Sequence, residues 1–383
     1  MSTLIRSTEA AAMLNVSKPT LYAYVSRGLL TRTTGADGRT SLFARDEVER
    51  LAQRSRRAPT GPRPTISVQI CSDITTIDES SLRYFGHDVV GLAASHRFED
   101  IADMLWSNGI GPISSQTNWP TVSPADRTGI APAGVLEMSP IARIATASYL
   151  LGELHSGDLP GEAARRLLIA VPDLLGSTRR TGRYAHRLAA AWRPRPTPEL
   201  VDAIDTALVL LADHELATST LAVRIAASVR TSPFVAFAAG LGSMEGALHG
   251  SASAEAHRFL EICADAEPAG IIAQRRSERR PIPGFGHKVY RGVDPRFPPL
   301  LDCVRRLDPD AVGLVEAVVT EAGRVMSHQP NVDLALGALT WAAGLEPNTP
   351  IFAIARIAGW GAHYAEEIGE PPVRFRGVAT PGR

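Results

Sequence analysis

The 383-residue sequence has few cysteines, only two lysines and no long apolar run. Its three cysteines, Cys71, Cys263 and Cys303, lie far apart and lack the paired spacing of a disulfide framework or a zinc site. The longest apolar runs, such as residues 234–242, are far shorter than the roughly 18 to 20 residues that cross a bilayer. The N-terminus also lacks the basic start and apolar stretch of a secretory signal. We therefore expect a protein of the reducing cytoplasm, without a membrane-spanning segment.

The chain carries no net charge, since 40 basic residues balance 40 acidic ones. This balance disfavours non-specific attraction of the whole chain to nucleic acid. The charges are unevenly distributed, however, because residues 1–57 hold ten basic and five acidic side chains and have a net charge of +5. A length of 383 residues exceeds one ordinary core, so the basic N-terminal segment is expected to form a domain of its own.

The first 55 residues have the pattern of a small winged helix-turn-helix domain. Residues 7–14 predict a helix, and Ser17 is placed to cap a second helix that ends at Gly28. Strand-forming residues on both sides of 35–38 predict a hairpin, and 45–54 predict a third helix. The stretch "TEAAAMLNVSKPTLYAYVSRGLL" resembles DNA-binding domains of the excisionase and MerR type. Residues 56–66, rich in Pro and Arg, are expected to be a linker.

The resemblance implies how this domain would bind DNA. The second helix would enter the major groove, and the wing would meet phosphates. The implied contact residues are Lys18, Thr20, Tyr22 and Tyr24 on the helix and Arg32 and Arg39 on the wing. A small helical module that binds protein is the alternative.

Beyond the linker the sequence is predominantly helical in pattern. The alternation of apolar and polar residues that is typical of a strand is confined to residues 65–78. No Gly-rich phosphate loop and no dinucleotide-binding fingerprint is present, so neither a P-loop nor a Rossmann fold is expected. Helix-like apolar spacing recurs in residues 98–106, 140–154, 199–229, 330–345 and 350–368.

Three separate stretches carry candidate chemistry. His249 lies among small residues, where a ligand or backbone can approach closely. The stretch "PIPGFGHKVYRGVDPR" contains one of the two lysines, with His287 and Arg296, and by itself predicts an anion-binding loop. Asp333 stands near the start of an otherwise apolar helix, where a carboxylate is either a cap or a working group.

Taken together, five segments resemble citrate synthase in sequence, order and separation, and the match covers most of residues 67–383. The segments are "LLADHELATST", "GALHG", "PGFGHKVYRGVDPR", "PNVD" and "PIFAIARIAGWGAHYAEE". An N-terminal segment, "SLRYFGHDVVGLAASHRFEDIADML", is also similar to that of the family.

The resemblance implies a catalytic trio that joins acetyl-CoA to oxaloacetate. Asp333 would remove a proton from the methyl carbon, His249 would donate to the thioester oxygen, and His287 would polarise the ketone. Oxaloacetate and acyl-CoA would be the bound substrates, with CoA as co-substrate and no permanently bound cofactor. No metal is expected, and His363 with Glu366 and Glu367 is interpreted as structural despite a helical metal-ligand spacing.

The resemblance also implies binding residues. His214, Arg296, Arg356 and Arg374 would bind the carboxylates of oxaloacetate, the last from a partner subunit, with Arg376 as the alternative. Gly284, Phe285, Gly286 and Arg291 would face the adenine and phosphate end of CoA.

The implied fold is a mostly helical homodimer with a large domain, 67–251 and 345–383, and a small domain, 252–344. Two alternatives stay open: a 2-methylcitrate synthase that uses propionyl-CoA, and a DNA-binding regulator whose synthase-like domain senses a metabolite. Ala217, which stands where the family usually has asparagine, and the basic N-terminal segment favour the regulator, whereas the presence of His249, His287 and Asp333 argues against it.

Overall fold

A computed structural model describes residues 4–14, 21–22, 24–25, 30–35, 40–45, 47–48, 69–246 and 250–377. The chain divides into two compact units, Met1–Cys71 and Ser72–Arg383, and each is described by itself. The predicted linker, 56–66, lies outside the described residues. Among the described residues, no helix combines the length and apolar character needed to cross a bilayer.

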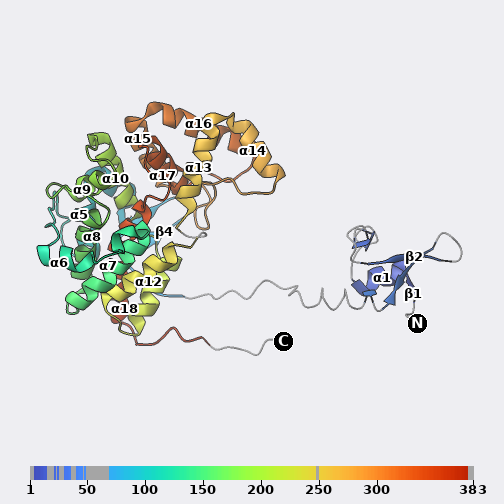
Figure 1. Cartoon of the computed structure of the whole chain (residues 1–383), viewed down its shortest axis with the longest axis horizontal. Helices are drawn as coiled ribbons and strands as arrows, with labels where there is room; N and C mark the ends of the chain where they lie inside the picture. The colour runs from blue at the N-terminus through green and yellow to red at the C-terminus, as the bar shows by residue number, and fades with distance from the viewer. Residues whose placement is uncertain are drawn as a thin grey trace. The chain divides into compact units, whose positions relative to one another are not determined.

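The first unit contains a helix and a three-stranded antiparallel sheet (Figure 1). The helix α1 (Ser7–Leu14) and the hairpin of β2 (Arg32–Thr34) and β3 (Ser41–Ala44) confirm the predicted elements. The strand β1 (Leu4–Arg6) was not predicted; it pairs with β3, which places β3 at the centre of the sheet. A separate core is formed by Ile5, Ala10, Ala11, Leu14, Leu21, Leu30, Phe43 and Val48.

The second unit starts with a small sheet and continues with helices. The sheet has the order β4 (Thr75–Ile77), β5 (Leu82–Tyr84) and β6 (His87–Asp88). The predicted strand character of 65–78 is therefore confirmed only at its end, among the residues described. The helices before the His249 segment are α4 (Val89–Ser95), α5 (Phe98–Trp106), α6 (Pro124–Ile130), α7 (Pro140–Leu154), α8 (Pro160–Leu174), α9 (Tyr184–Trp192), α10 (Pro198–Leu211), α11 (Thr218–Ser228) and α12 (Pro233–Met244), with a 3-10 turn η1 (Val135–Glu137).

Several of these helices begin with the same local signal, a Ser or Thr followed by Pro. The hydroxyl accepts a hydrogen bond from an otherwise unpaired amide of the first turn, and Pro fits the first helical position because its missing N–H would be unpaired there. The capped starts are Ser123 of α6, Ser139 of α7, Thr197 of α10 and Ser232 of α12.

The helices after residue 250 include a group that packs mainly on itself, visible together in Figure 1. The group consists of α13 (Ala252–Asp265), α14 (Pro268–Ser277), α15 (Phe297–Leu307), α16 (Pro309–Val325) and α17 (Val332–Ala342). Within the group α13 and α15 pack on α17, and α15 also packs on α10. This grouping supports the predicted small domain, 252–344, which remains a prediction.

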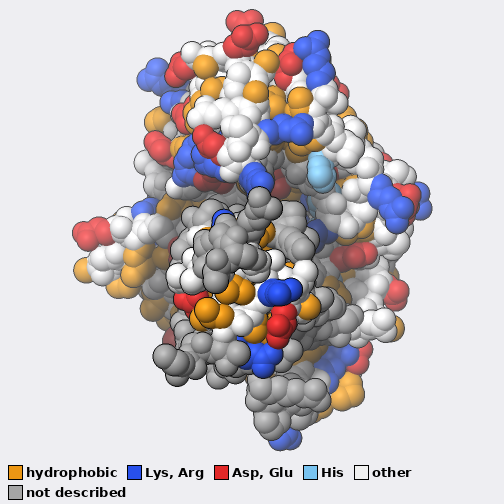
Figure 2. Space-filling model, turned by 90° about the vertical axis from the view of Figure 1, so that its right-hand side faces the viewer, with side chains coloured by type: hydrophobic (Ala, Val, Ile, Leu, Met, Phe, Trp, Pro, Cys, Tyr) orange, Lys and Arg blue, Asp and Glu red, His pale blue; other side chains and the backbone are white. Residues whose placement is uncertain are grey.

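The last helix, α18 (Ile351–Ile368), runs through the core of the second unit. It packs against α5, α8, α10, α11 and α12, and nearly all of its side chains are buried. Glycine allows this close packing: a Cβ at Gly359 would collide with Asp213 and with the carbonyl of Ala212. On the face in Figure 2, basic and acidic side chains are interspersed over the described surface, as the zero net charge suggests.

One predicted helical stretch, 199–229, is interrupted. Helix α10 ends at Leu211 and α11 starts at Thr218. Between them Glu215 adopts a left-handed φ of 49°, and the amide of Glu215 bonds the buried carboxylate of Asp213. The apolar period continues through this break, so the pattern alone does not reveal it. The turn matters because it carries His214 into the site.

Candidate active site

A cavity of about 590 Å³ lies where several segments of the second unit meet. Its lining comes from the turn between α10 and α11, the loop at 286–289, the starts of α15 and α17, and one face of α18. Six of the predicted site residues line it together: His214, Gly286, His287, Arg296, Asp333 and Arg356. These residues span more than 140 positions of the chain, so the fold itself assembles the site.

The loop that carries His287 is attached to the start of α17. The amide of Gly286 donates to Gln329 O at 2.8 Å, and the amide of Asn331 donates to Gly284 O at 2.9 Å. The Asn331 side-chain amide also donates to Gly286 O at 2.7 Å. Gly284 has a φ of 80°, and a Cβ there would lie 2.6 Å from Leu334 Cβ. Glycine is therefore required for the loop to approach the helix that bears Asp333.

His287 is held as a neutral ring with a defined tautomer. Its Nδ1 accepts hydrogen bonds from the amides of Val289 at 3.0 Å and Tyr290 at 3.3 Å. Burial and the Arg296 charge lower the pKa of His287, which keeps the ring uncharged near neutral pH. With Nδ1 occupied as an acceptor, Nε2 carries the proton. The ring can therefore donate a hydrogen bond from Nε2 to a carbonyl oxygen.

His214 is the second neutral imidazole of the cavity. Its Nε2 lies 3.1 Å from Tyr290 Oη, and its ring meets the His287 ring edge-on with centroids 5.2 Å apart. Burial, followed by the charges of Arg296 and Arg356, lowers the pKa of His214 well below its ordinary value. The sequence did not single out Tyr290, which contacts both rings.

Asp333 has the protonation behaviour expected of a general base. It occupies the first turn of α17, where its amide donates to the capping Asn331 Oδ1 at 3.0 Å. Burial raises the pKa of Asp333 to about 6, against the opposing attraction of Arg296. A carboxylate with this pKa is ionised at neutral pH, and it is a stronger base than an exposed aspartate.

Two buried arginines and the exposed Lys288 give the cavity its positive charge. Arg296 is 3% exposed and bonds both oxygens of Asp294. Arg356 is 2% exposed, and its Nε and Nη1 have no hydrogen-bond partner among the described residues. Burial lowers the pKa of Arg356 to about 10. A buried guanidinium with unpaired donors facing a cavity is suited to bind a carboxylate.

The predicted CoA residues flank a neighbouring cavity of about 440 Å³. Gly286 and Arg291 line it together with His287 and Glu79. Arg291 is exposed and pairs with Glu79 at 3.1 Å. Phe285 forms an isolated bridge with Pro330, and Gly284 lies beneath it against α17. The assignment of Gly284, Phe285, Gly286 and Arg291 to CoA stays a prediction.

The remaining predicted residues lie elsewhere. Arg374 is absent from the described lining of the large cavity and instead bonds Glu367 of its own chain at 2.8 and 2.6 Å. His249 lies outside the described residues, as do Lys18, Thr20 and Arg39 of the N-terminal domain. Tyr22 is described and donates to Ser41 Oγ at 3.2 Å, with the Arg32 guanidinium 5.9 Å from its ring centre.

Known protein families match both units of this chain. The model of the citrate synthase C-terminal domain matches residues 67–375, and a helix-turn-helix domain model matches residues 4–56. The chain belongs to the citrate synthase family. Membership identifies it as a condensing enzyme of the acyltransferase type, with a helix-turn-helix domain at its N-terminus.

Individual relatives agree with this family assignment. Citrate synthase 2 of Bacillus subtilis is 28% identical over 338 residues, 78% of this chain and 90% of the relative. The 2-methylcitrate synthase of Mycobacterium tuberculosis is 27% identical over 356 residues, 82% of this chain and 91% of the relative. The crystal structure of citrate synthase from Pyrobaculum aerophilum has the same fold, with a TM-score of 0.68 at 23% identity over 82% of this chain and 89% of that one.

Proposed function

We propose that this citrate synthase family member condenses acetyl-CoA with oxaloacetate and releases citrate and free CoA. The observation that carries the proposal is the cavity that joins Asp333, His287, Arg296 and Arg356. It places a base of raised pKa, a neutral donor and two cations around one space. Condensation needs these three kinds of group together, because a weak carbon acid is deprotonated while a dicarboxylate ketone is activated.

In the proposed mechanism, the carboxylates of oxaloacetate bind Arg356 and Arg296, and His214 donates a further hydrogen bond. His287 Nε2 donates to the ketone oxygen. Asp333 removes a proton from the methyl carbon of the thioester, whose oxygen would be stabilised by His249. The resulting enol carbon attacks the ketone carbon, which forms the new C–C bond, and the ketone oxygen takes up a proton. Water then hydrolyses the citryl thioester to give citrate and the free thiol of CoA.

Propionyl-CoA is the alternative acyl donor, which would make the product 2-methylcitrate. This alternative is supported by the nearly equal identity of the chain to a relative named citrate synthase and to one named 2-methylcitrate synthase. The same residues would serve both reactions, because one methylene in an acyl pocket changes binding by only about 1 to 3 kcal/mol.

We also propose that the protein acts as a homodimer. The helices α7 and α11 both pack on α12, and four large apolar side chains on α7, on α11 and at the end of α11 are each about half accessible: Tyr149, Leu154, Ile225 and Val229. Exposed apolar surface is typical of an interface. In the dimer, Arg374 or Arg376 would reach the partner's cavity. Arg374 is engaged by Glu367, whereas Arg376 is exposed, so the structure supports Arg376 as a candidate of equal standing.

A thiol-release assay tests the proposed reaction. Purified full-length protein is mixed with oxaloacetate and, in separate reactions, acetyl-, propionyl- or a longer acyl-CoA. We expect thiol release that requires oxaloacetate and disappears in the D333N variant. No release with any acyl-CoA would contradict the proposal and would favour a metabolite-sensing regulator. The ratio of kcat/KM for acetyl- and propionyl-CoA decides between citrate and 2-methylcitrate.

We propose, in addition, that the N-terminal domain binds DNA. The helix-turn-helix match and the net charge of +5 in residues 1–57 support this. We expect full-length protein to retard promoter fragments at low salt, with affinity that falls as salt rises. Unchanged mobility at low salt would favour a protein-binding role for the domain.

A further inference from the structure

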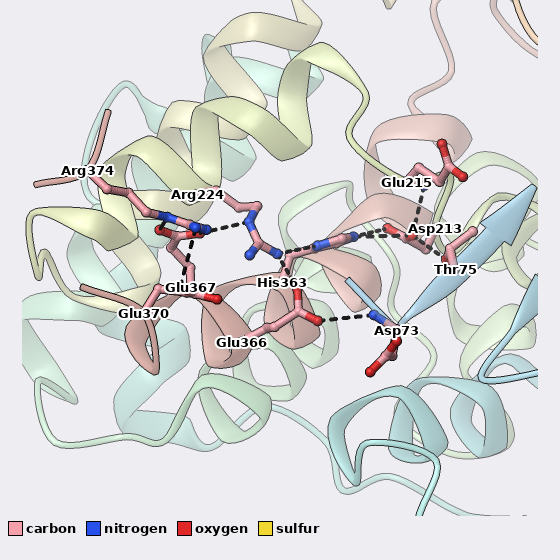
Figure 3. A network of polar contacts seen from close by, with 10 residues as sticks. All are labelled: Asp73, Thr75, Asp213, Glu215, Arg224, His363, Glu366, Glu367, Glu370 and Arg374. Atoms are coloured by element: carbon pink, nitrogen blue, oxygen red, sulfur yellow. Dashed lines mark hydrogen bonds and ion pairs between the residues drawn. The ribbon is translucent and has the colours of Figure 1, made fainter. Parts of the chain in front are cut away.

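A chain of buried polar contacts leads from the C-terminal tail to the turn that holds His214 (Figure 3). Its centre is Arg224 on α11, whose side chain is fully buried. The Arg224 Nε donates to Glu367 Oε2 at 2.8 Å, and Nη1 donates to His363 Nδ1 at 3.0 Å and also to Glu366. The same Glu367 bonds Arg374 in the tail. Arg224 therefore links α11 to the C-terminal half of α18.

Arg224 determines which tautomer His363 adopts. A guanidinium has donors and no acceptor, so His363 Nδ1 can only accept from it. In the neutral ring the proton is then on Nε2, which lies 3.2 and 3.3 Å from the two carboxylate oxygens of Asp213. His363 thus transmits the position of Arg224 to Asp213 through a donor of fixed orientation.

Asp213 is fully buried and organises the turn next to it. Its Oδ2 accepts from Thr75 Oγ1 at 2.5 Å and from the amide of Glu215 at 3.1 Å. Glu215 itself adopts a left-handed φ of 49°, which redirects the chain after this hydrogen bond. His214 lies between these two anchored residues, and its own ring reaches the cavity. The orientation of His214 therefore depends on the Asp213 carboxylate.

We infer that His363 is a positioning residue for His214: it holds the Asp213 carboxylate, which fixes the turn that presents His214 to the substrate. Arg224 acts one step further away by fixing the His363 tautomer. The inference rests on the proposed role of His214 in binding oxaloacetate. The two ring nitrogens of His363 have different protein partners, Arg224 and Asp213. This arrangement differs from that of a metal ligand and from that of a residue that only packs.

A matched pair of substitutions tests this role in the full-length protein. H363N keeps an oxygen where Nδ1 accepts from Arg224, but its side chain is too short to reach Asp213. H363Q extends far enough to place an amide N–H near the position of Nε2. We expect H363N to raise the KM for oxaloacetate about tenfold with the KM for acyl-CoA within about twofold of wild type, and H363Q to restore most of the loss.

A control separates positioning from general destabilisation. His257 on α13 is another buried histidine, and its Nδ1 lies 2.8 Å from Thr340 Oγ1. We expect H257L to lower the melting temperature without changing the KM for oxaloacetate. Equal rises in both KM values for H363N, an unchanged KM for oxaloacetate, or no difference between H363N and H363Q would overturn the inference.

Failure of the proposed function gives a different result. If the wild-type protein releases no thiol from any acyl-CoA, the reaction is wrong. The positioning role is then measured by calorimetric titration of oxaloacetate into wild type, H363N and H363Q, with the same tenfold difference in affinity expected between H363N and the other two proteins. Equal affinities of the three would overturn the inference in that case as well.

Discussion

Asp294 and Arg296 form a two-pronged ion pair beside the cavity. Arg296 Nε donates to Asp294 Oδ1 at 2.9 Å, and Nη2 donates to Oδ2 at 2.8 Å. Oδ2 also accepts from the amide of Val332 at 3.1 Å, directly before Asp333. One carboxylate therefore fixes the orientation of Arg296, the proposed substrate-binding cation, and the start of the helix that carries Asp333, the proposed base.

Substitution D294N tests this dual role. Asparagine retains the shape of the side chain but provides only one acceptor oxygen, so the fork to Arg296 is broken. We expect the KM for oxaloacetate to rise roughly tenfold, and the free energy of unfolding to fall by about 3 kcal/mol because a buried arginine loses its counter-ion. Steady-state kinetics and urea unfolding measure the two effects. An unchanged KM would show that Asp294 does not orient Arg296 for binding.

The raised pKa of Asp333 predicts an acid limb in the pH profile. Because the base must be ionised, kcat/KM is expected to fall below a pH of about 6. The folded-state pKa exceeds the ordinary value of 3.8, so the folded protein holds more protons and stability decreases as pH rises from about 4 to 6. The D333N substitution removes the free-energy cost of ionising a buried carboxylate. It should be inactive, yet more stable at pH 7 by at most about 3 kcal/mol. An acid limb near pH 4 would contradict the environment described for Asp333.

Arg356 should lower the stability of the ligand-free protein and should be essential for binding oxaloacetate. Its guanidinium is buried with two nitrogens unpaired among the described residues. We expect R356M to retain or slightly raise the melting temperature without ligand, because an uncompensated buried charge is removed. Affinity for oxaloacetate should fall by about a hundredfold or more, as calorimetry would measure. A large loss of stability without ligand would indicate that Arg356 is mainly structural.

Complementation tests the proposal that an arginine from the partner subunit completes the site. R374A and R376A are each co-expressed with D333N, with different affinity tags so that mixed dimers can be purified. If Arg376 serves the partner, R376A alone is inactive, and a mixed dimer with D333N recovers one working site. That site combines Asp333 from one subunit with Arg376 from the other. Recovery with R374A instead would assign the role to Arg374, and recovery with neither would argue against a shared site.

The start of α11 offers a stability test. Ala217 occupies the N-cap, with φ −54° and ψ 158°, and provides no side-chain hydrogen bond. A217S would supply an acceptor for an amide of the first turn, so we expect the free energy of unfolding to rise by about 1 kcal/mol. Urea unfolding measures the change against the wild-type protein, whose Ala217 lacks a side-chain acceptor. Equal stability of A217S and wild type would show that capping is not limiting here.

Local patterns predicted the long helices and the β2–β3 hairpin, but not the strand β1. Residues 98–106 and 140–154 form α5 and α7 as predicted, because each has a complete apolar face. The three-residue strand β1 is too short for alternation to be recognised, and its pairing with β3 is a contact between distant residues. The break between α10 and α11 depends on the buried Asp213, whose partners come from β4 and α18.

The sequence pattern gave candidate site residues, and the family resemblance supplied their implied roles and the other binding residues. Spacing alone gave His287, Arg296 and Asp333 as candidates, but it could not place them around the same cavity. Tyr290 and Asp294 were missed because their importance comes from contacts with His214 and Arg296 in the folded chain. Arg224 and His363 are 139 positions apart, and periodicity contains no information about such a pair.

The geometry of α18 limits where residues can be inserted into or deleted from this chain. Arg356 and His363 are seven residues apart, which is nearly two turns of helix, so both project from the same side. Deleting or inserting one residue between them would rotate one relative to the other by about 100° and carry either the cavity cation or the Asp213 partner out of reach. Length variation among descendants of this chain is therefore expected in its loops, while the interval from 356 to 363 keeps its length.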